Sequence, residues 1–199
     1  MTELSVNNFM LQIDFLDDNG NYDLLYSHIK HKQLRTVIDI GAWWGPWSLW
    51  WHDKADNVEI FEPNKDILPK LQNNIGNFKN CTIHATALGD RQGKVSMEYA
   101  DHSGTFHVSD DKGNIDIKTL DSFNFNCVDV IKIDAEGFEI PVLRGATETI
   151  LKNRPWIQIE GNKSGARYGR TKLDIKNFLQ DIGMTRVAKK WPDQIWNFQ

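Results

Sequence analysis

A chain of 199 residues, 40% of them hydrophobic, is long enough for one domain with a substantial buried core. Its net charge of −4, without long runs of one sign, argues against a nucleic-acid-binding module that relies on a broad basic surface. The first residues lack a basic start and no apolar run approaches the roughly 18 residues of a membrane span, so we expect a cytoplasmic protein that works without a membrane.

The first half of the chain alternates strand-like and helix-like segments. The apolar run RTVIDIG, residues 35–41, predicts a buried parallel strand, and a short helix follows from Pro46, a residue suited to the first helical position. A second strand is predicted at 56–63, a helix at 65–75 that ends at Gly76, and a third strand at 80–88. Cys81 and Cys127 are isolated near apolar segments, which predicts two buried thiols rather than a disulfide or a metal site.

The second half continues the alternation. Residues 93–123 mix short alternating runs with glycine and aspartate, which predicts β-hairpins or loops on the substrate side instead of a crossover helix. Strands are predicted at 127–137 and 155–161, with a helical segment at 139–153 between them. A helix at 171–183 and two short strands around a Pro-Asp turn at 184–198 complete a doubly wound α/β sheet.

Ligands of such sheets bind outside the carboxyl ends of the strands, and here those ends carry carboxylates. At the first end, Gly41 and Gly45 allow the backbone to approach a ligand closely, but Trp43 stands where a dinucleotide fingerprint has its second glycine, and the third is missing. Glu62, 21 residues beyond Gly41, is placed to accept hydrogen bonds from both ribose hydroxyls. The pattern favours a nucleoside ligand without a diphosphate.

Several motifs in order resemble those of the FkbM-type S-adenosylmethionine-dependent methyltransferases: VIDIGAWWGPWSL, VEIFEPN, TALGD, TLDSF, VDVIKIDAEGFEIPVLRGA and PWIQIE. They span about 36–160, roughly two thirds of the chain. The resemblance implies a Rossmann-like class I methyltransferase fold, a mostly parallel seven-stranded sheet with an antiparallel last strand, helices on both faces and a β-rich insertion before the fourth strand. It also implies one domain over 1–199, with a helical or loop cap at 1–35 and the core at 36–199.

The resemblance implies the cofactor and its contacts. S-adenosylmethionine would place its methionine part along Asp39, Gly41, Ala42 and Gly45 and its ribose on Glu62. Pro63 and Asn64 would lie beside the adenosine, and Thr86, Ala87 and Leu88 would flank the adenine. The family's turn usually reads Gly-Ala-Asn, an aliphatic residue and Gly, whereas Trp43 and Trp44 occupy those two places here.

Five of the eight tryptophans lie around this glycine turn. Trp47, Trp50 and Trp51 fall within one arc of roughly 100° on a helix, which predicts core packing against the sheet. Trp43 and Trp44 precede the helix, where an indole could cover the cofactor or form an acceptor pocket. Trp43 is therefore counted with the cofactor residues.

Methyl transfer to a sugar or other hydroxyl, the acceptor class that the resemblance implies, needs a group that takes the acceptor's proton. Asp134, at the end of the fourth predicted strand, is the first candidate as base or acceptor-orienting group and adjoins the cofactor, and Glu160 follows it. Glu136 lies in the turn after Asp134, and His102 and His107 are candidate bases in the insertion.

Asp134, Glu136 and Glu160 could also bind a divalent cation, although their spacing does not require one. Two alternatives to a methyltransferase remain open: a nicotinamide-dependent oxidoreductase, and a protein that binds the cofactor without catalysis.

Overall fold

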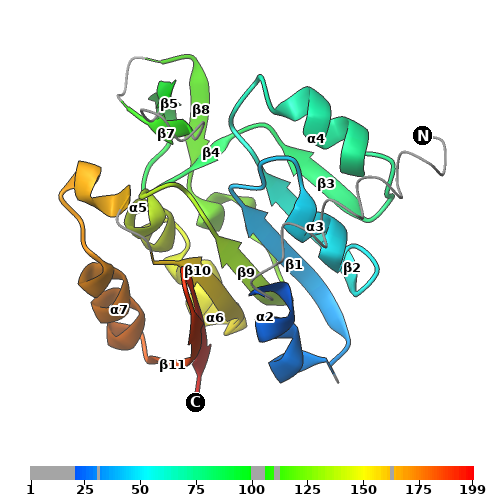
Figure 1. Cartoon of the computed structure of the whole chain (residues 1–199), viewed down its shortest axis with the longest axis vertical. Coiled ribbons are helices and arrows are strands. Elements are labelled where there is room, and N and C mark those ends of the chain that lie inside the picture. Colours follow the sequence, from blue (N-terminus) through cyan, green and yellow to red (C-terminus); the bar gives the residue numbers. More distant parts are fainter. Residues whose placement is uncertain (1–20, 31, 100–105, 110–112, 162–163) are drawn as a thin grey trace.

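The structure is a computed structural model, and it describes residues 21–30, 32–99, 106–109, 113–161 and 164–199 (Figure 1). A seven-stranded sheet has the order β11-β12-β10-β9-β1-β2-β3. Its strands are β1 (Leu34–Ile40), β2 (Ala55–Phe61), β3 (Cys81–His84), β9 (Val128–Ile133), β10 (Trp156–Glu160), β11 (Met184–Lys190) and β12 (Asp193–Phe198). All neighbouring pairs in this sheet are parallel except the two that β12 makes with β10 and β11, so the predicted mostly parallel sheet with an antiparallel last strand is confirmed.

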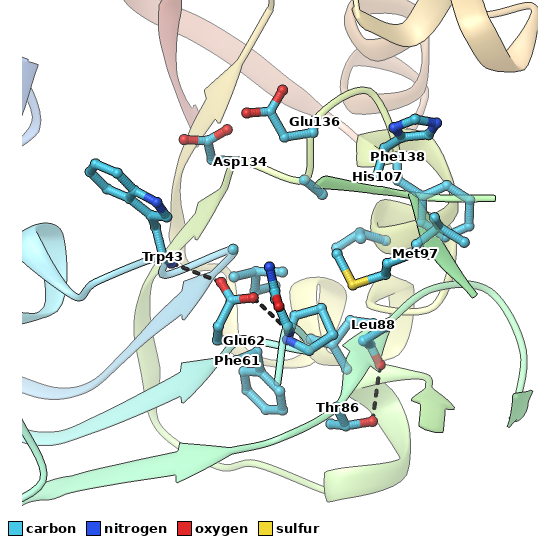
Figure 2. Close-up of a pocket in the computed structure, with 18 of the residues that line it drawn as sticks. Trp43, Phe61, Glu62, Thr86, Leu88, Met97, His107, Asp134, Glu136 and Phe138 are labelled. Atoms are coloured by element: carbon cyan, nitrogen blue, oxygen red, sulfur yellow. Dashed lines mark hydrogen bonds between the residues drawn. The ribbon is translucent and has the colours of Figure 1, made fainter. Parts of the chain in front are cut away.

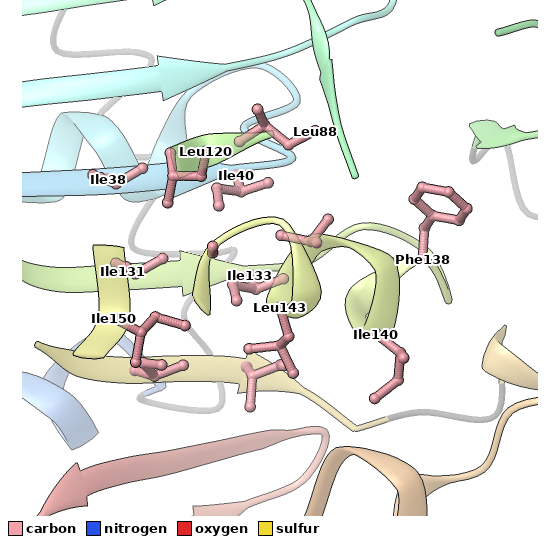
Figure 3. Close-up of a cluster of buried hydrophobic side chains, with 14 of the residues drawn as sticks. Ile38, Ile40, Leu88, Leu120, Ile131, Ile133, Phe138, Ile140, Leu143 and Ile150 are labelled. Atoms are coloured by element: carbon pink, nitrogen blue, oxygen red, sulfur yellow. The ribbon is translucent and has the colours of Figure 1, made fainter. Parts of the chain in front are cut away.

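Helices cover both faces of this sheet, as predicted. One face carries α2 (Asn21–Ile29), α3 (Pro46–Trp51) and α4 (Leu68–Ile75), and the other carries α5 (Glu139–Arg144), α6 (Thr147–Asn153) and α7 (Lys172–Asp181). Neighbouring strand residues alternate between the two cores: Ile38 and Ile131 pack on the second face, whereas Val37 and Val130 pack on the first. Figure 3 shows the core that α5 and α6 cover.

The predicted cap at 1–35 is described only from residue 21, so its first 20 residues lie outside the described part of the chain. Within it, α2 packs Leu25 and Ile29 into the first core. The first strand begins at Leu34, just before the expected core boundary at residue 36.

The third predicted strand divides in two. β3 ends at His84, and β4 (Ala87–Leu88) leaves the main sheet to pair in parallel with β8 (Ile115–Lys118). β8 also pairs with β5 (Gly93–Val95), and β6 (Met97–Tyr99) pairs with β7 (Phe106–Val108). The β-rich insertion is thus confirmed; a short 3₁₀ helix, η1 (Leu120–Phe123), follows it.

Two predicted helices have different bounds. The helix expected at 65–75 begins only at Leu68, because the side chain of Asn64 accepts a hydrogen bond from the Asp66 N–H and forms a turn. The helical segment at 139–153 divides into α5 and α6 at Gly145, where a Cβ atom would lie 1.9 Å from the Gly89 oxygen. The backbone of the insertion's first turn therefore occupies the place that a side chain would need.

Neither cysteine is fully buried as predicted. Both thiols are free, Cys81 is half-buried and Cys127 is exposed. Its φ of 60° places it in a turn before β9, so its side chain does not join the apolar run that follows.

Two of the three helix tryptophans, Trp47, Trp50 and Trp51, pack in the core as predicted. Trp47 and Trp51 are buried with ring centroids 5.3 Å apart, whereas Trp50 is half-buried under the Lys54 ammonium. The Trp47 Nε1 donates to Gln158 Oε1 at 3.1 Å. These contacts fix α3 against the centre of the sheet.

Candidate active site

A cavity of about 420 Å³ lies where β1, β2, β4 and β9 end (Figure 2). Its lining combines the exits of these strands with side chains from the insertion and α5: Ile40, Gly41, Trp43, Phe61, Glu62, Pro63, Asn64, Ile67, Thr86, Ala87, Leu88, Met97, His107, Val108, Asp134, Ala135, Glu136, Phe138 and Val142. The side near Leu88, Met97 and Val142 is apolar. Asp134 and Glu136 make another side acidic, and Glu62 lines the cavity apart from them (Figure 2).

A chain of hydrogen-bonded polar side chains supports the Gly41 turn. Asp39, which is fully buried, accepts hydrogen bonds from Ser48 Oγ at 2.6 Å and from Lys132 Nζ at 3.1 Å. Lys132 also donates to the Gly41 oxygen at 3.0 Å. Because a Cβ on Gly41 would lie 1.8 Å from the Asp134 oxygen, only glycine permits the ends of β1 and β9 to approach this closely.

Glu62 joins this turn to the end of β2. Its Oε2 accepts from the Trp43 N–H and its Oε1 from the Asn64 N–H, both at 2.8 Å. Burial raises the pKa of Glu62 to about 7 although these two hydrogen bonds and Lys132 act in the opposite direction. Each oxygen retains a second lone pair, so the carboxylate can still receive two hydroxyl donors from a ligand.

Asn64 supplies a polar group that lacks a partner. Its Nδ2 is buried without a hydrogen bond among the described residues, while its Oδ1 is held by the Asp66 N–H. A buried amide without a partner is costly, and this one lines the cavity beside Glu62. A nucleoside with ribose hydroxyls and a base with acceptor nitrogens fits both residues.

On the acidic side, Asp134 forms a hydrogen-bonded pair with Glu160, whose pKa is raised. Burial and the neighbouring Asp134 raise the pKa of Glu160 to about 9, and the two side chains are hydrogen-bonded. Glu160 therefore carries the proton at neutral pH and donates a hydrogen bond to Asp134. Lys132 Nζ lies 3.7 Å from Asp134 Oδ2, so these two side chains lie on the same face of the sheet edge.

Glu136 and His107 both line the cavity, and the charge of Arg167 acts on both. Burial and Asp134 raise the pKa of Glu136 to about 6, against the opposing charge of Arg167. Arg167 belongs to the 3₁₀ helix η2 (Ser164–Tyr168), and the pKa of His107 is lowered by burial and by the same guanidinium. Arg167 was not identified from the sequence.

The cavity brings together most of the residues singled out in the sequence. Nine of the predicted cofactor residues line it: Gly41, Trp43, Glu62, Pro63, Asn64, Thr86, Ala87, Leu88 and Asp134. Asp39, Ala42 and Gly45 do not line it and support the turn from behind. Among the candidate catalytic residues, Asp134, Glu136 and His107 line the cavity, Glu160 reaches it through Asp134, and His102 lies outside the described residues.

Several lining side chains were given no role from the sequence. Among them, Met97 and Val108 come from separate strands of the insertion, and Phe138 lies within the VDVIKIDAEGFEIPVLRGA motif. An alternating pattern identifies strands, but it does not tell which face of an inserted hairpin turns toward the main sheet.

Neither a metal site nor a membrane span is found in the part of the chain that the structure describes. Among the described residues, no three side chains of His, Cys, Asp or Glu are arranged to hold a metal ion. The set Asp134, Glu136 and Glu160 is therefore not arranged as a metal site either. None of the helices described is long and apolar enough to cross a membrane.

Known proteins resemble the chain in sequence and in fold. Residues 39–184 match the model of the methyltransferase FkbM domain. The hexuronic acid methyltransferase AglP of Haloferax volcanii is 29% identical over 144 residues, which are 67% of this chain and 59% of that protein. The chain thus spans less than two thirds of that relative.

Two solved structures share the fold. The methyltransferase FkbM of Methylobacillus flagellatus aligns with a TM-score of 0.60 and 21% identity over 83% of this chain and 44% of that one. A Streptococcus mutans protein in complex with S-adenosylhomocysteine (SAH) aligns with a TM-score of 0.57 and 12% identity over 88% and 95% of the two chains.

The sheet order and the cavity at its carboxyl edge define a class I methyltransferase fold. Within that class, the chain belongs to the FkbM methyltransferase domain family.

Proposed function

We propose that this protein transfers a methyl group from S-adenosylmethionine to an oxygen of a small hydroxylated acceptor, with sugars as the favoured class. The observation that carries the proposal is the meeting of Glu62, Asn64 and Asp134 in one cavity. The family supports methyl transfer, and the hexuronic acid acceptor named for the Haloferax relative supports a sugar or glycan. The family assignment speaks against the oxidoreductase alternative.

The residues divide the work between the two sides of the cavity. Glu62 and Asn64 hold the nucleoside, and Thr86 to Leu88 with Met97 enclose its base. The bound cofactor supplies an electrophilic methyl group on a sulfonium. The acceptor oxygen forms a bond to that methyl carbon as the carbon–sulfur bond breaks, and the electron pair of that bond remains on sulfur.

Asp134 takes the proton that the acceptor hydroxyl loses. It lies at the end of β9, beside the turn that would hold the methionine part, and its carboxylate lines the cavity. Glu160 acts through Asp134, because its protonated carboxyl group holds the Asp134 carboxylate in place. We therefore assign Asp134 as the base and Glu160 as a positioning residue.

The first test is binding. Calorimetry with SAH, S-adenosylmethionine and NAD should show binding of the first two, and SAH should change the tryptophan fluorescence because Trp43 lines the cavity. Tight binding of NAD without any binding of SAH would overturn the cofactor assignment.

The second test is turnover, followed as SAH formation over a panel of sugars, glycosides and small hydroxylated molecules. Asp134→Asn should lower turnover by roughly 100-fold or more, the scale of general-base loss, with much of the SAH affinity retained. Glu160→Gln, which keeps a donor toward Asp134, should lower turnover less. Wild-type turnover in Asp134→Asn across pH would exclude the base role, and SAH binding without any methylated acceptor would favour a binding protein.

A further inference from the structure

Trp43 combines two costly features at the cavity mouth. Its φ of 52° is the left-handed conformation, which is unusual for a bulky residue. Its side chain remains 40% exposed while it lines the cavity. A residue that is both strained and exposed at a ligand site points to a contact that the protein alone does not provide.

The indole is nevertheless held in a fixed position. Trp44 stacks on it, with ring centroids 4.0 Å apart and planes 12° from parallel. Lys70 on α4 places its ammonium 2.9 Å from the Trp44 ring centroid, and Asn74 donates to the Trp44 oxygen at 2.9 Å. The order is therefore Lys70, Trp44, Trp43, with the exposed part of the Trp43 ring at the outer end.

The position of this outer ring separates it from the side that would hold the nucleoside base. Figure 2 shows the Trp43 indole beside Asp134, away from Thr86 and Leu88. The backbone of Trp43, and not its ring, contacts the ribose-binding carboxylate through Glu62 Oε2. The ring and Asp134 thus line the same cavity, and in Figure 2 both lie away from Thr86 and Leu88.

The charge of the stack favours a neutral ring over a cation. An indole face attracts cations and polarised C–H groups through its negative π cloud. Because Lys70 already places a positive charge at the inner end of the stack, the stack attracts a second cation at its outer end less strongly than a lone indole would. The C–H face of a sugar ring has no such penalty.

We propose that Trp43 is an acceptor-binding platform on which a pyranose ring stacks, with the reacting hydroxyl directed toward Asp134. This inference rests on the proposed methyltransferase function and narrows its acceptor to cyclic sugars. Trp44 and Lys70 position the platform and do not touch the sugar.

The test uses saturation-transfer NMR on the full chain loaded with SAH. The probes are glucuronic acid, galacturonic acid and methyl glucoside, with glycerol as a hydroxylated molecule that has no ring face. The informative variant is Trp43→Asn, since asparagine tolerates positive φ and keeps the backbone N–H that binds Glu62. Trp43→Phe retains an aromatic face.

A matched control lies in the turn between β11 and β12. Trp191 is 55% exposed, and Lys172 lies 3.7 Å from its ring centroid. Trp191 does not line the cavity, so Trp191→Asn removes a comparable indole outside the site. We expect the pyranose Kd to rise about threefold to tenfold in Trp43→Asn, the range for a lost aromatic contact, and to stay near the wild-type value in Trp43→Phe and Trp191→Asn. The SAH Kd should change by less than about twofold, because the Trp43 N–H that binds Glu62 is kept and the platform assigns the ring to the acceptor rather than to the cofactor.

Three results would overturn the platform. The first is no pyranose signal with the SAH-loaded wild type, and the second is an unchanged pyranose Kd in Trp43→Asn. The third is a large loss of SAH affinity without loss of sugar affinity, which would assign the ring to the cofactor. Failure of SAH to bind the wild type is seen before any sugar is added and counts against the proposed function; pyranose binding that still depends on Trp43 would then support the platform alone.

Discussion

At the scale of single residues, Glu62 links ligand binding to pH. Its pKa is raised to about 7 by burial, and ribose hydroxyls donate best to the ionised carboxylate. Binding below pH 7 must therefore release a proton. We expect SAH affinity to rise as the pH increases from 6 to 8, by at most about tenfold per unit below the pKa.

Glu62→Gln should remove this pH dependence and weaken SAH binding at pH 8 by about 1.5 to 3 kcal/mol, the range for a lost hydrogen bond to a charged group. Calorimetry at several pH values measures both effects. Glu59→Gln is the control on the same strand, because Glu59 pairs with His84 at 2.7 Å and does not line the cavity. A Glu62→Gln curve parallel to the wild type would remove Glu62 from the linkage.

The sequence allowed residues such as Glu62 and Asp134 to be proposed because a parallel sheet gathers its carboxyl ends at one edge. It did not separate residues that face the cavity from those that support it. Asp39 stands at a strand end as they do, yet it points toward α3 and bonds to Ser48. Which of two neighbouring side chains faces a ligand depends on the strand's twist and register, and a single sequence does not give these.

At the scale of elements, the contact between the ends of β1 and β9 depends on one missing side chain. Gly41 and Gly183 both have positive φ, 77° and 88°. Of the two, only Gly41 has backbone atoms, those of Asp134, at the position that a Cβ would occupy. Gly183 has no atom within 4 Å of that position. The two glycines therefore separate conformational strain from steric overlap.

We expect Gly183→Ala to lower the free energy of unfolding by about 1 to 2 kcal/mol, the cost of a left-handed alanine. Gly41→Ala should cost at least about 3 kcal/mol, since β1 and β9 must also move apart, and it should abolish SAH binding. Urea unfolding followed by tryptophan fluorescence gives the comparison. Equal losses in the two variants would mean that the Gly41 turn accommodates a methyl group.

The order and type of the elements were predictable because apolar runs and helix signals are local. The division of the third strand was not. Ala87 and Leu88 continue the apolar run of β3, and only their pairing with Ile117 and Lys118 takes them into another sheet. That pairing joins positions some 30 residues apart and leaves no local signal.

At the scale of the whole molecule, the buried carboxyl groups make stability depend on pH. The pKa values of Glu62 and Glu139 are raised to about 7, that of Glu136 to about 6 and that of Glu160 to about 9, above the ordinary 4.5. The folded protein then holds more protons than the unfolded chain between about pH 4.5 and 9. The contribution of these four groups to the free energy of unfolding is fully present below that window and is lost as the pH rises through it.

Without ligand, the free energy of unfolding should fall by at least about 2 kcal/mol from pH 5 to pH 8, which denaturant titrations at fixed ionic strength would measure. Glu139→Gln is the informative variant, because Glu139 accepts from the Ala135 and Gly137 N–H groups and does not line the cavity. It should reduce the slope of the profile, and because the glutamine oxygen can accept from the same two N–H groups, it should keep the turn that lines the cavity. A stability that increases over this range would show that these carboxyl groups are ionised in the folded protein.

The pairing of β4 with β8 also bears on how acceptor preference can diverge. The two ends of the segment between Leu88 and Ile117 lie next to each other in the fold. Ala87 lies opposite Ile117, and the Gly89 N–H donates to the Lys118 oxygen at 2.9 Å. Exchanging a segment with adjacent ends adds little chain-closure entropy. Met97, His107 and Val108 all lie within it, whereas Gly41, Glu62 and Asp134 do not. A new hairpin could therefore replace one wall of the cavity, including Met97 beside the nucleoside base, and leave the ribose-binding Glu62 and the proposed base Asp134 in place.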